Sequence, residues 1–202
     1  MKQFVRRIRS EQLILDAAKE LIREKGCRQT TLAQLMKKTA LSKGALYHYI
    51  SSKDDLMAKV MTSIMEETND LFLARLSEGE ESYLHPEEVL AGQISALDQP
   101  GQIISEIFTY FIARSDEKAA REALDEFYDN IYQFALLWIR SGQKNGSIHK
   151  GIDPHKLAEL YLLLLDGFRL RKALGQSGFT FNAGDTASLF RLLFTKDLPA
   201  VR

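Results

Sequence analysis

Apolar residues recur every three or four positions along most of the chain, which is the spacing of amphipathic helices. The first such stretch predicts a helix from about Ser10 to Lys25, and Gly26 follows it as a C-terminal stop. Its apolar face consists of Ile14, Ala17, Ala18, Leu21 and Ile22.

Capping residues divide the next segment into two short helices. Thr31 and Gln34 have the spacing of a capping box, which predicts a helix that ends near Thr39. After a tight break, Ser42 is placed to cap a third helix that runs to about Tyr49.

The remainder of the chain is also predicted to be helical. Ser52 caps a long fourth helix that continues to about Leu76, and Asp153 before Pro154 begins a helix that ends near Leu174. Further helices are predicted over about 101–113, 117–143 and 184–195, with a polar linker at 79–86 and a turn at 98–101. The fold class is therefore all-α, with three short helices, a long connecting helix and a C-terminal bundle.

Charge is distributed unevenly along the 202 residues, although Lys+Arg and Asp+Glu both number 27. Residues 1–60 contain 13 basic and 6 acidic side chains, whereas residues 61–202 contain 14 and 21. This asymmetry indicates that the first part meets a polyanion, or else that two solvated surfaces differ in charge by chance.

The composition also excludes several classes of protein. One cysteine, Cys27, excludes a disulfide framework and a cysteine-based zinc cluster, and we interpret it as a small buried side chain. No apolar run reaches the ~18 residues of a membrane span, and the N-terminal sequence is no signal peptide. We therefore expect a cytoplasmic protein.

Residues 30–56 have the organisation of a helix-turn-helix, since two short helices flank a tight turn and a longer helix precedes them. The N-terminal end of such a second helix fits the major groove of DNA, and here that end carries Lys43 and Gly44. Arg6, Arg7 and Arg9 precede the predicted first helix and are expected to form a flexible basic arm.

This segment closely resembles the DNA-binding domain of the TetR family of bacterial transcriptional regulators. The matching motifs occur in the family's order and spacing: Thr30-Thr31, Ser42-Lys43-Gly44, Leu46-Tyr47-His48-Tyr49, Ser52-Lys53 and Leu56. The resemblance covers about residues 10–60 by motif and the remainder by length and helix pattern. It implies a DNA-binding domain over residues 1–52 and an effector-binding and dimerisation domain over residues 53–202.

The resemblance also implies which residues contact double-stranded DNA. Thr31, Tyr47 and Lys53 are expected to bind phosphate, and Lys43, Gly44, Ala45 and His48 are candidates for contact with base edges; Ser42 completes the set. Three departures from the family pattern put the tilt of the recognition helix in question: Leu35-Met36, Thr39-Ala40-Leu41 and Ile50. An alanine at position 40 costs about 1 kcal/mol if that position needs a positive φ.

The C-terminal part is expected to form a homodimer through the last two long helices, as the resemblance implies. Its aromatic residues suggest a pocket for a small, mainly apolar effector, although Arg114, Arg140 and Arg169 leave an anionic ligand open. The candidate lining residues are Met61, Met65, Phe108, Phe111, Phe134 and Trp138. Members of the family are homodimers that release DNA on binding a ligand, so the chain is expected to be a repressor released from a palindromic operator.

Other functions remain as alternatives. The chain could be a regulator without an effector or an activator, or an interaction module that has lost DNA binding. An all-α enzyme is disfavoured because no convergent set of acid, base and nucleophile is present, and no cofactor is expected. His149, Asp153 and His155 could bind a metal, but helix capping explains Asp153 more simply.

Overall fold

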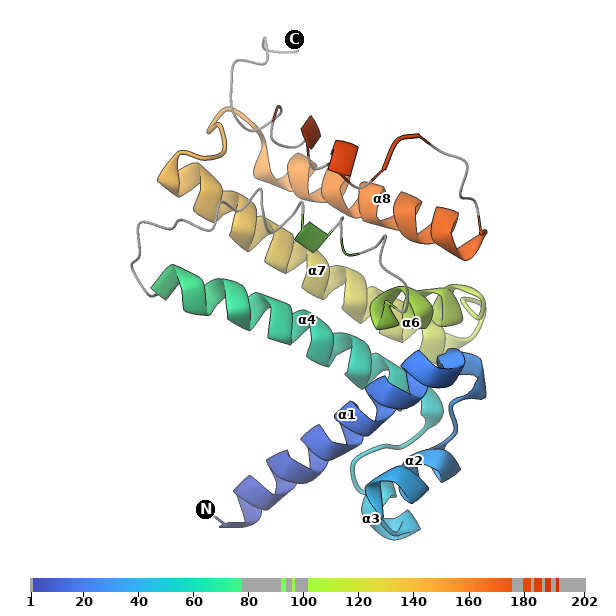
Figure 1. Cartoon of the computed structure of the whole chain (residues 1–202). Helices are drawn as coiled ribbons and strands as arrows, with labels where there is room; N and C mark the ends of the chain where they lie inside the picture. The colour runs from blue at the N-terminus through green and yellow to red at the C-terminus, as the bar shows by residue number, and fades with distance from the viewer. Residues whose placement is uncertain are drawn as a thin grey trace. The chain divides into compact units, whose positions relative to one another are not determined.

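The fold is all-α, as predicted. The computed structural model describes residues 2–77 and 102–175, together with 92–93, 96, 180–182, 184–186, 188–189 and 192, and no strand occurs among them. The helices are α1 (Lys2–Gln29), α2 (Leu32–Thr39), α3 (Lys43–Tyr47), α4 (Lys53–Ser77), α6 (Ile103–Ile112), α7 (Lys118–Asn145) and α8 (Pro154–Ala173), labelled in Figure 1.

The chain divides into two compact units. Residues 1–66 and 101–127 form the first unit, which holds α1–α3, the first part of α4, α6 and the start of α7. Residues 67–100 and 128–202 form the second unit, which holds most of α7 and all of α8. The predicted functional division after residue 52 is a separate matter, and it stays a prediction.

The core of the first unit forms around α1, which contacts both α2 and α6. The ammonium of Lys38 on α2 lies 2.7 Å from the Glu20 carboxylate and 3.5 Å from that of Glu24, so ion pairs also join α2 to α1. The fully buried apolar side chains of this core include Ile14, Ala18, Ile22, Leu35, Leu46 and Leu56.

The predicted helix caps are present and explain where the short helices begin. The Thr31 hydroxyl accepts a hydrogen bond from the Gln34 backbone N–H, and the Gln34 side chain accepts one from the Thr31 N–H. Ser42 accepts from the backbone of Ala45 at 3.3 Å, and Ser52 accepts from the backbone of Asp55 at 3.1 Å. Local hydrogen bonds that can be read from the sequence thus set the helix starts.

The turn between α2 and α3 depends on a strained alanine. Ala40 is the C-cap of α2 and has φ 55° and ψ 22°, in the left-handed region. A side chain in this region costs about 1–2 kcal/mol relative to glycine. The alanine at position 40, where the chain departs from the family pattern, therefore carries the cost expected for a positive φ.

Replacement of Ala40 with glycine is expected to stabilise the protein by about 1 kcal/mol, because the strain of the left-handed backbone disappears. The melting temperature should rise by about 2–4 °C in thermal unfolding followed by circular dichroism. The matched control is Ala33→Gly in the first turn of α2, where the backbone is already helical, and it should not raise the stability. A destabilising Ala40→Gly would refute the assignment of strain.

The start of the chain differs from the prediction. α1 begins at Lys2 rather than near Ser10, so the backbone of Arg6, Arg7 and Arg9 is helical and the predicted flexible basic arm is wrong. The amphipathic stripe does begin at Ile14, but the residues before it are mostly good helix formers, and they extend the helix. The predicted stop at Gly26 is visible as a non-helical residue with φ 75°.

In the second unit, α7 and α8 run antiparallel. Tyr132 on α7 is hydrogen-bonded to His155 near the start of α8 at 2.7 Å, whereas Tyr128, one turn earlier on α7, donates to Asp166 farther along α8 at 2.8 Å. The predicted cap of α8 is confirmed, since Asp153 accepts from the His155 N–H at 2.9 Å and Pro154 follows.

Three predicted segments lie wholly or mostly outside the described residues. The linker at 79–86 and the turn at 98–101 lie wholly outside them, and so does most of the last predicted helix at 184–195. Within the described helices, none is both long and apolar enough to cross a membrane.

Candidate nucleic-acid interface

The third helix has one face in the core and another open to solvent. Leu46 is fully buried and Ile50 nearly so, which fixes α3 against the rest of the first unit. Ser42, Lys43, Gly44, Tyr47 and His48 are exposed. A short helix anchored by its apolar side and exposed on its polar side can present these groups to a partner.

Two of the exposed side chains of α3 lie together. The Lys43 ammonium lies 5.8 Å from the centroid of the Tyr47 ring, within the range of a cation–π contact. Tyr47 is 46% exposed. Tyr49 is half-buried, and its ring packs edge-on against His48 at 5.1 Å between centroids.

Thr31 presents a hydroxyl at the start of α2. It is exposed and its oxygen accepts the capping hydrogen bond from Gln34, which leaves the hydroxyl hydrogen for donation to another acceptor. Ala45 is half-buried, whereas a Cβ added at Gly44 would meet no atom within 4 Å. Packing within the chain therefore does not require glycine at position 44.

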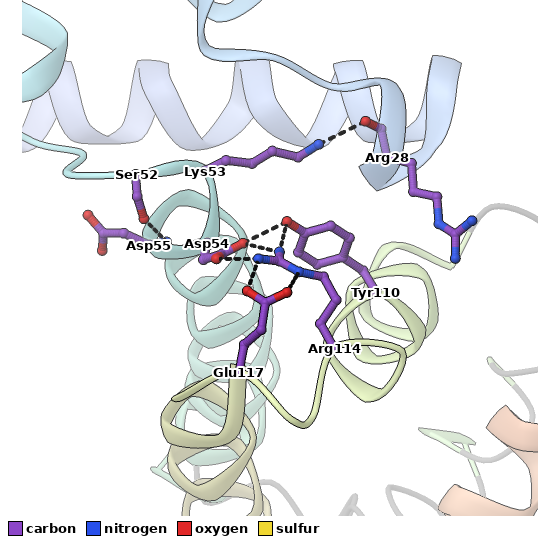
Figure 2. A network of polar contacts seen from close by, with 8 residues as sticks. All are labelled: Arg28, Ser52, Lys53, Asp54, Asp55, Tyr110, Arg114 and Glu117. Atoms are coloured by element: carbon purple, nitrogen blue, oxygen red, sulfur yellow. Dashed lines mark hydrogen bonds and ion pairs between the residues drawn. The ribbon is translucent and has the colours of Figure 1, made fainter. Parts of the chain in front are cut away.

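Lys53 lies in different surroundings from the other predicted DNA contacts. Its ammonium donates to the backbone carbonyl of Arg28 at 2.8 Å and lies 5.4 Å from the Tyr110 ring centroid (Figure 2). Desolvation lowers the pKa of Lys53, and its charged neighbours offset this only in part. The structure thus gives Lys53 a role inside the first unit, and the predicted phosphate contact stays a prediction.

The core predictions around the helix-turn-helix hold with one exception. Leu35, Leu46 and Ile50 are buried as predicted, whereas Leu41 is only half-buried. Leu41 follows the left-handed residue of the turn, where the chain has left α2 and has not yet entered α3. Its side chain therefore does not lie on the buried face of either helix.

The predicted effector residues are distributed over both units. Met61, Met65, Phe108 and Phe111 are buried in the first unit. Phe134 and Trp138 are in the second unit, where their rings stack with centroids 6.4 Å apart. The structure does not test the assignment of these six residues to a pocket, which stays a prediction.

Two cavities of the first unit are lined by other residues. A groove of about 490 Å³ between α1 and α4 includes Leu15, Lys59 and Ser63. A smaller cavity of about 270 Å³ lies where α1 ends beside α6, and it includes Cys27, Glu106 and Tyr110. Neither contains any of the six predicted effector residues.

The three arginines considered for anion binding all contact groups of the chain itself. Arg114 pairs with Asp54 and Glu117, Arg140 contacts the His155 ring at 3.2 Å, and Arg169 pairs with Asp166 at 3.2 Å. Arg169 is almost fully buried, and desolvation by this burial lowers its pKa.

The histidines considered as metal ligands also have other partners. The His149 ring accepts from the Gly151 N–H at 3.1 Å, and His155 contacts Tyr132 and Arg140. Among the described residues there is no group of three His, Cys, Asp or Glu side chains able to hold a metal ion.

Cys27 is buried, as the sequence predicts. Desolvation, together with the charge of Glu106, raises the pKa of its thiol to about 12. At pH 8 only about one thiol in ten thousand is then ionised, and the thiolate is the reactive form.

Native Cys27 is therefore expected to react with a disulfide reagent such as DTNB at least about 100-fold more slowly than a free thiol at pH 8. Unfolding in guanidinium should restore rapid labelling of one thiol per chain. Because the chain has one cysteine, the absorbance change reports this residue alone. Rapid stoichiometric labelling of the native protein would contradict the assigned burial and pKa.

The two short helices α2 and α3, joined by a tight turn and preceded by the longer α1, have the organisation of a helix-turn-helix domain. Residues 14–60 match the family described as "Bacterial regulatory proteins, tetR family". The chain is 25% identical over 162 residues to the HTH-type transcriptional regulator PksA of Bacillus subtilis, covering 80% of this chain and 77% of PksA.

Solved structures show the same fold. GusR of Salmonella enterica has a TM-score of 0.64 at 19% identity, with 93% of this chain and 96% of GusR covered. The regulator FadR of Bacillus subtilis, solved in complex with stearoyl-CoA, has a TM-score of 0.58 at 19% identity, with 90% and 96% covered. Residues 14–60 therefore form a DNA-binding domain of the TetR family, and the relatives that match most of the chain are transcriptional regulators.

Proposed function

We propose that this chain is a homodimeric repressor that a small, mainly apolar ligand releases from a palindromic operator. The observation that carries the proposal is the face of α3, where Lys43, Tyr47 and His48 are exposed above the buried Leu46. Since residues 14–60 form a DNA-binding domain, this is the surface best suited to contact DNA.

The roles proposed for individual residues follow their chemistry. Lys43, Gly44, Ala45 and His48 are assigned to base edges, Thr31, Tyr47 and Lys53 are assigned to the phosphate backbone, and Ser42 completes the contact set. The glycine at position 44 supports the assignment, because the chain's own packing does not explain it and a side chain there would keep the DNA at a distance.

A row of exposed leucines on α8 supports the proposed homodimer. Leu163 and Leu170 are 69% and 56% exposed in the single chain. With Leu160, Gly167 and Leu174 they repeat at intervals of three or four residues, which places them on one face of the helix. An apolar stripe of this kind fits a second copy of the same helix, and a two-fold dimer would present α3 to two half-sites about one DNA turn apart.

The proposed effector is a small, mainly apolar molecule. The six residues Met61, Met65, Phe108, Phe111, Phe134 and Trp138 are proposed to bind the effector. The stacked pair Phe134–Trp138 supports an apolar ligand, since Phe134 is only half-buried and leaves part of its ring accessible. The structure of FadR with stearoyl-CoA gives an acyl chain as the first ligand class to test. The proposed site of action is the cytoplasm.

The experiment that tests the function is selection of bound sequences from a random DNA duplex library at moderate salt. A palindromic consensus with two half-sites is the expected result. The selected duplex then serves to screen apolar ligands, with fatty acyl compounds first, for release of the protein from DNA. A folded, dimeric protein that enriches no sequence would contradict the proposal.

A further inference from the structure

The first turn of α4 connects three other parts of the first unit. Its residues Lys53, Asp54 and Asp55 are adjacent in sequence, but each side chain binds a different element, and the first two are shown in Figure 2 with their partners. Lys53 donates to the carbonyl of Arg28 near the end of α1, at 2.8 Å. Asp54 and Asp55 bind in two further directions.

Asp55 and Lys59 hold the segment that follows α3. The Asp55 carboxylate accepts from the backbone N–H of Ser51 at 2.6 Å and from the Ser51 hydroxyl at 2.9 Å. One turn later, Lys59 donates to the carbonyl of Tyr49 at 2.5 Å and lies 3.3 Å from Asp55. The segment that directly follows α3 is thus fixed to the first two turns of α4.

Asp54 binds the corner between α6 and α7. Both its oxygens accept from the Arg114 guanidinium, at 2.6 and 3.1 Å, and one also accepts from the Tyr110 hydroxyl at 2.6 Å. Arg114 contacts the Tyr110 hydroxyl as well, and its guanidinium lies 4.9 Å from the Tyr110 ring centroid. A two-point contact of this kind fixes orientation as well as distance.

The Asp54–Arg114 pair is sheltered from solvent. Desolvation alone would raise the pKa of Asp54, but the hydrogen bonds from Arg114 and Tyr110 outweigh it and lower the pKa. The side chains are 19% and 30% exposed, whereas the second partner of Arg114, Glu117, is 48% exposed. Asp54 is therefore the partner through which Arg114 acts on the interior of the unit.

We propose that Arg114 is a positioning residue for DNA binding, which through Asp54 holds the first turn of α4 and thereby sets the orientation of α3. The inference rests on the proposed reading of DNA by α3. The corner between α6 and α7 has no predicted DNA contact, yet by this inference it controls operator affinity. When the pair is lost, every side chain predicted to contact DNA is still present, but α3 is no longer held in one orientation.

The test compares Arg114→Met and Asp54→Asn with the wild type on the duplex selected above and on random duplex DNA. Each variant is expected to lose about tenfold in operator affinity and less than about twofold in affinity for random DNA. The double variant should lose no more than either single variant, because the two residues act as one unit. Arg114→Lys, which keeps the charge but not the two-point contact, should behave like Arg114→Met.

Two control variants separate positioning from charge. Arg121→Met removes an exposed arginine on α7, and Glu117→Gln alters the more exposed partner of Arg114. Both should keep the operator affinity of the wild type within about twofold. If Arg114→Met also keeps it, or loses affinity equally for operator and random DNA, the proposal is refuted.

A second measurement does not depend on DNA. In Arg114→Met, the backbone amides of residues 46–51 should exchange hydrogen about tenfold faster than in the wild type, whereas those of Ile14–Ile22 on α1 should not change. Unchanged exchange at 46–51 would overturn the proposal even if the wild type selected no operator. Faster exchange together with a wild type that selects no operator would support the positioning role and count against the proposed function alone.

Discussion

Replacement of Lys43 with alanine is expected to weaken binding to the selected operator about 10- to 100-fold, while affinity for random DNA falls less than about threefold. The reason is the position of Lys43 in the first turn of α3, exposed and held near the Tyr47 ring. A cation at that end of a recognition helix reaches base edges, and loss of one base contact costs about 1–3 kcal/mol on the cognate site.

The contrasting variant is Tyr47→Phe. It keeps the ring that lies beside Lys43 and removes only the hydroxyl, so it should weaken binding to all sequences by a similar, smaller factor of about 3–10. Lys37→Ala is the control for charge, because Lys37 is exposed on α2 and has no predicted DNA contact. Titrations by fluorescence anisotropy at one fixed salt concentration measure all three. Equal loss on operator and random DNA for Lys43→Ala would show that Lys43 binds phosphate and not bases.

The local part of the fold could be predicted from the sequence because its determinants are local. The caps at Thr31, Ser42, Ser52 and Asp153 lie within three residues of the groups they bind, and the residue types at each helix start predict them. The strain at Ala40, with φ 55°, also has a signal in the sequence, because Thr39-Ala40-Leu41 departs from the family pattern. Helix ends that lack such a signal, above all the start of α1, were predicted less well.

The partners of the charged side chains could not be predicted in the same way. Asp54 lies in the first turn of α4, where a carboxylate favours the positive end of the helix, but its side chain binds Arg114, which is 60 positions farther along the chain. Lys53 matches a family motif for DNA contact, yet its ammonium binds the Arg28 carbonyl. Which partner a long side chain reaches depends on how helices pack, and periodicity does not contain that information.

The uneven charge along the chain indicates a polyanionic partner, but it does not show which cations are free to bind that partner. The basic excess of residues 1–60 pointed to a polyanion, but part of it neutralises groups within the unit. Lys38 pairs with Glu20 and Glu24, and Lys59 binds Asp55 and the Tyr49 carbonyl. Fewer cations are therefore left at the surface of the helix-turn-helix than the count of basic residues implies. The expected contribution of Lys43 to DNA affinity is correspondingly larger.

A chain with Leu163→Glu and Leu170→Glu is expected to be monomeric and to lose more than about 100-fold in operator affinity. Both side chains are exposed in the single chain, so the substitutions should leave its melting temperature nearly unchanged. In a dimer paired through α8, they would bring like charges together and remove the apolar contact, and a monomer engages only one half-site. Sedimentation equilibrium should give about 23.0 kDa instead of twice that mass. Leu137→Glu, at an exposed leucine of α7, is the matched control and should remain dimeric. A double variant that keeps the dimer mass would exclude this face of α8 as the interface.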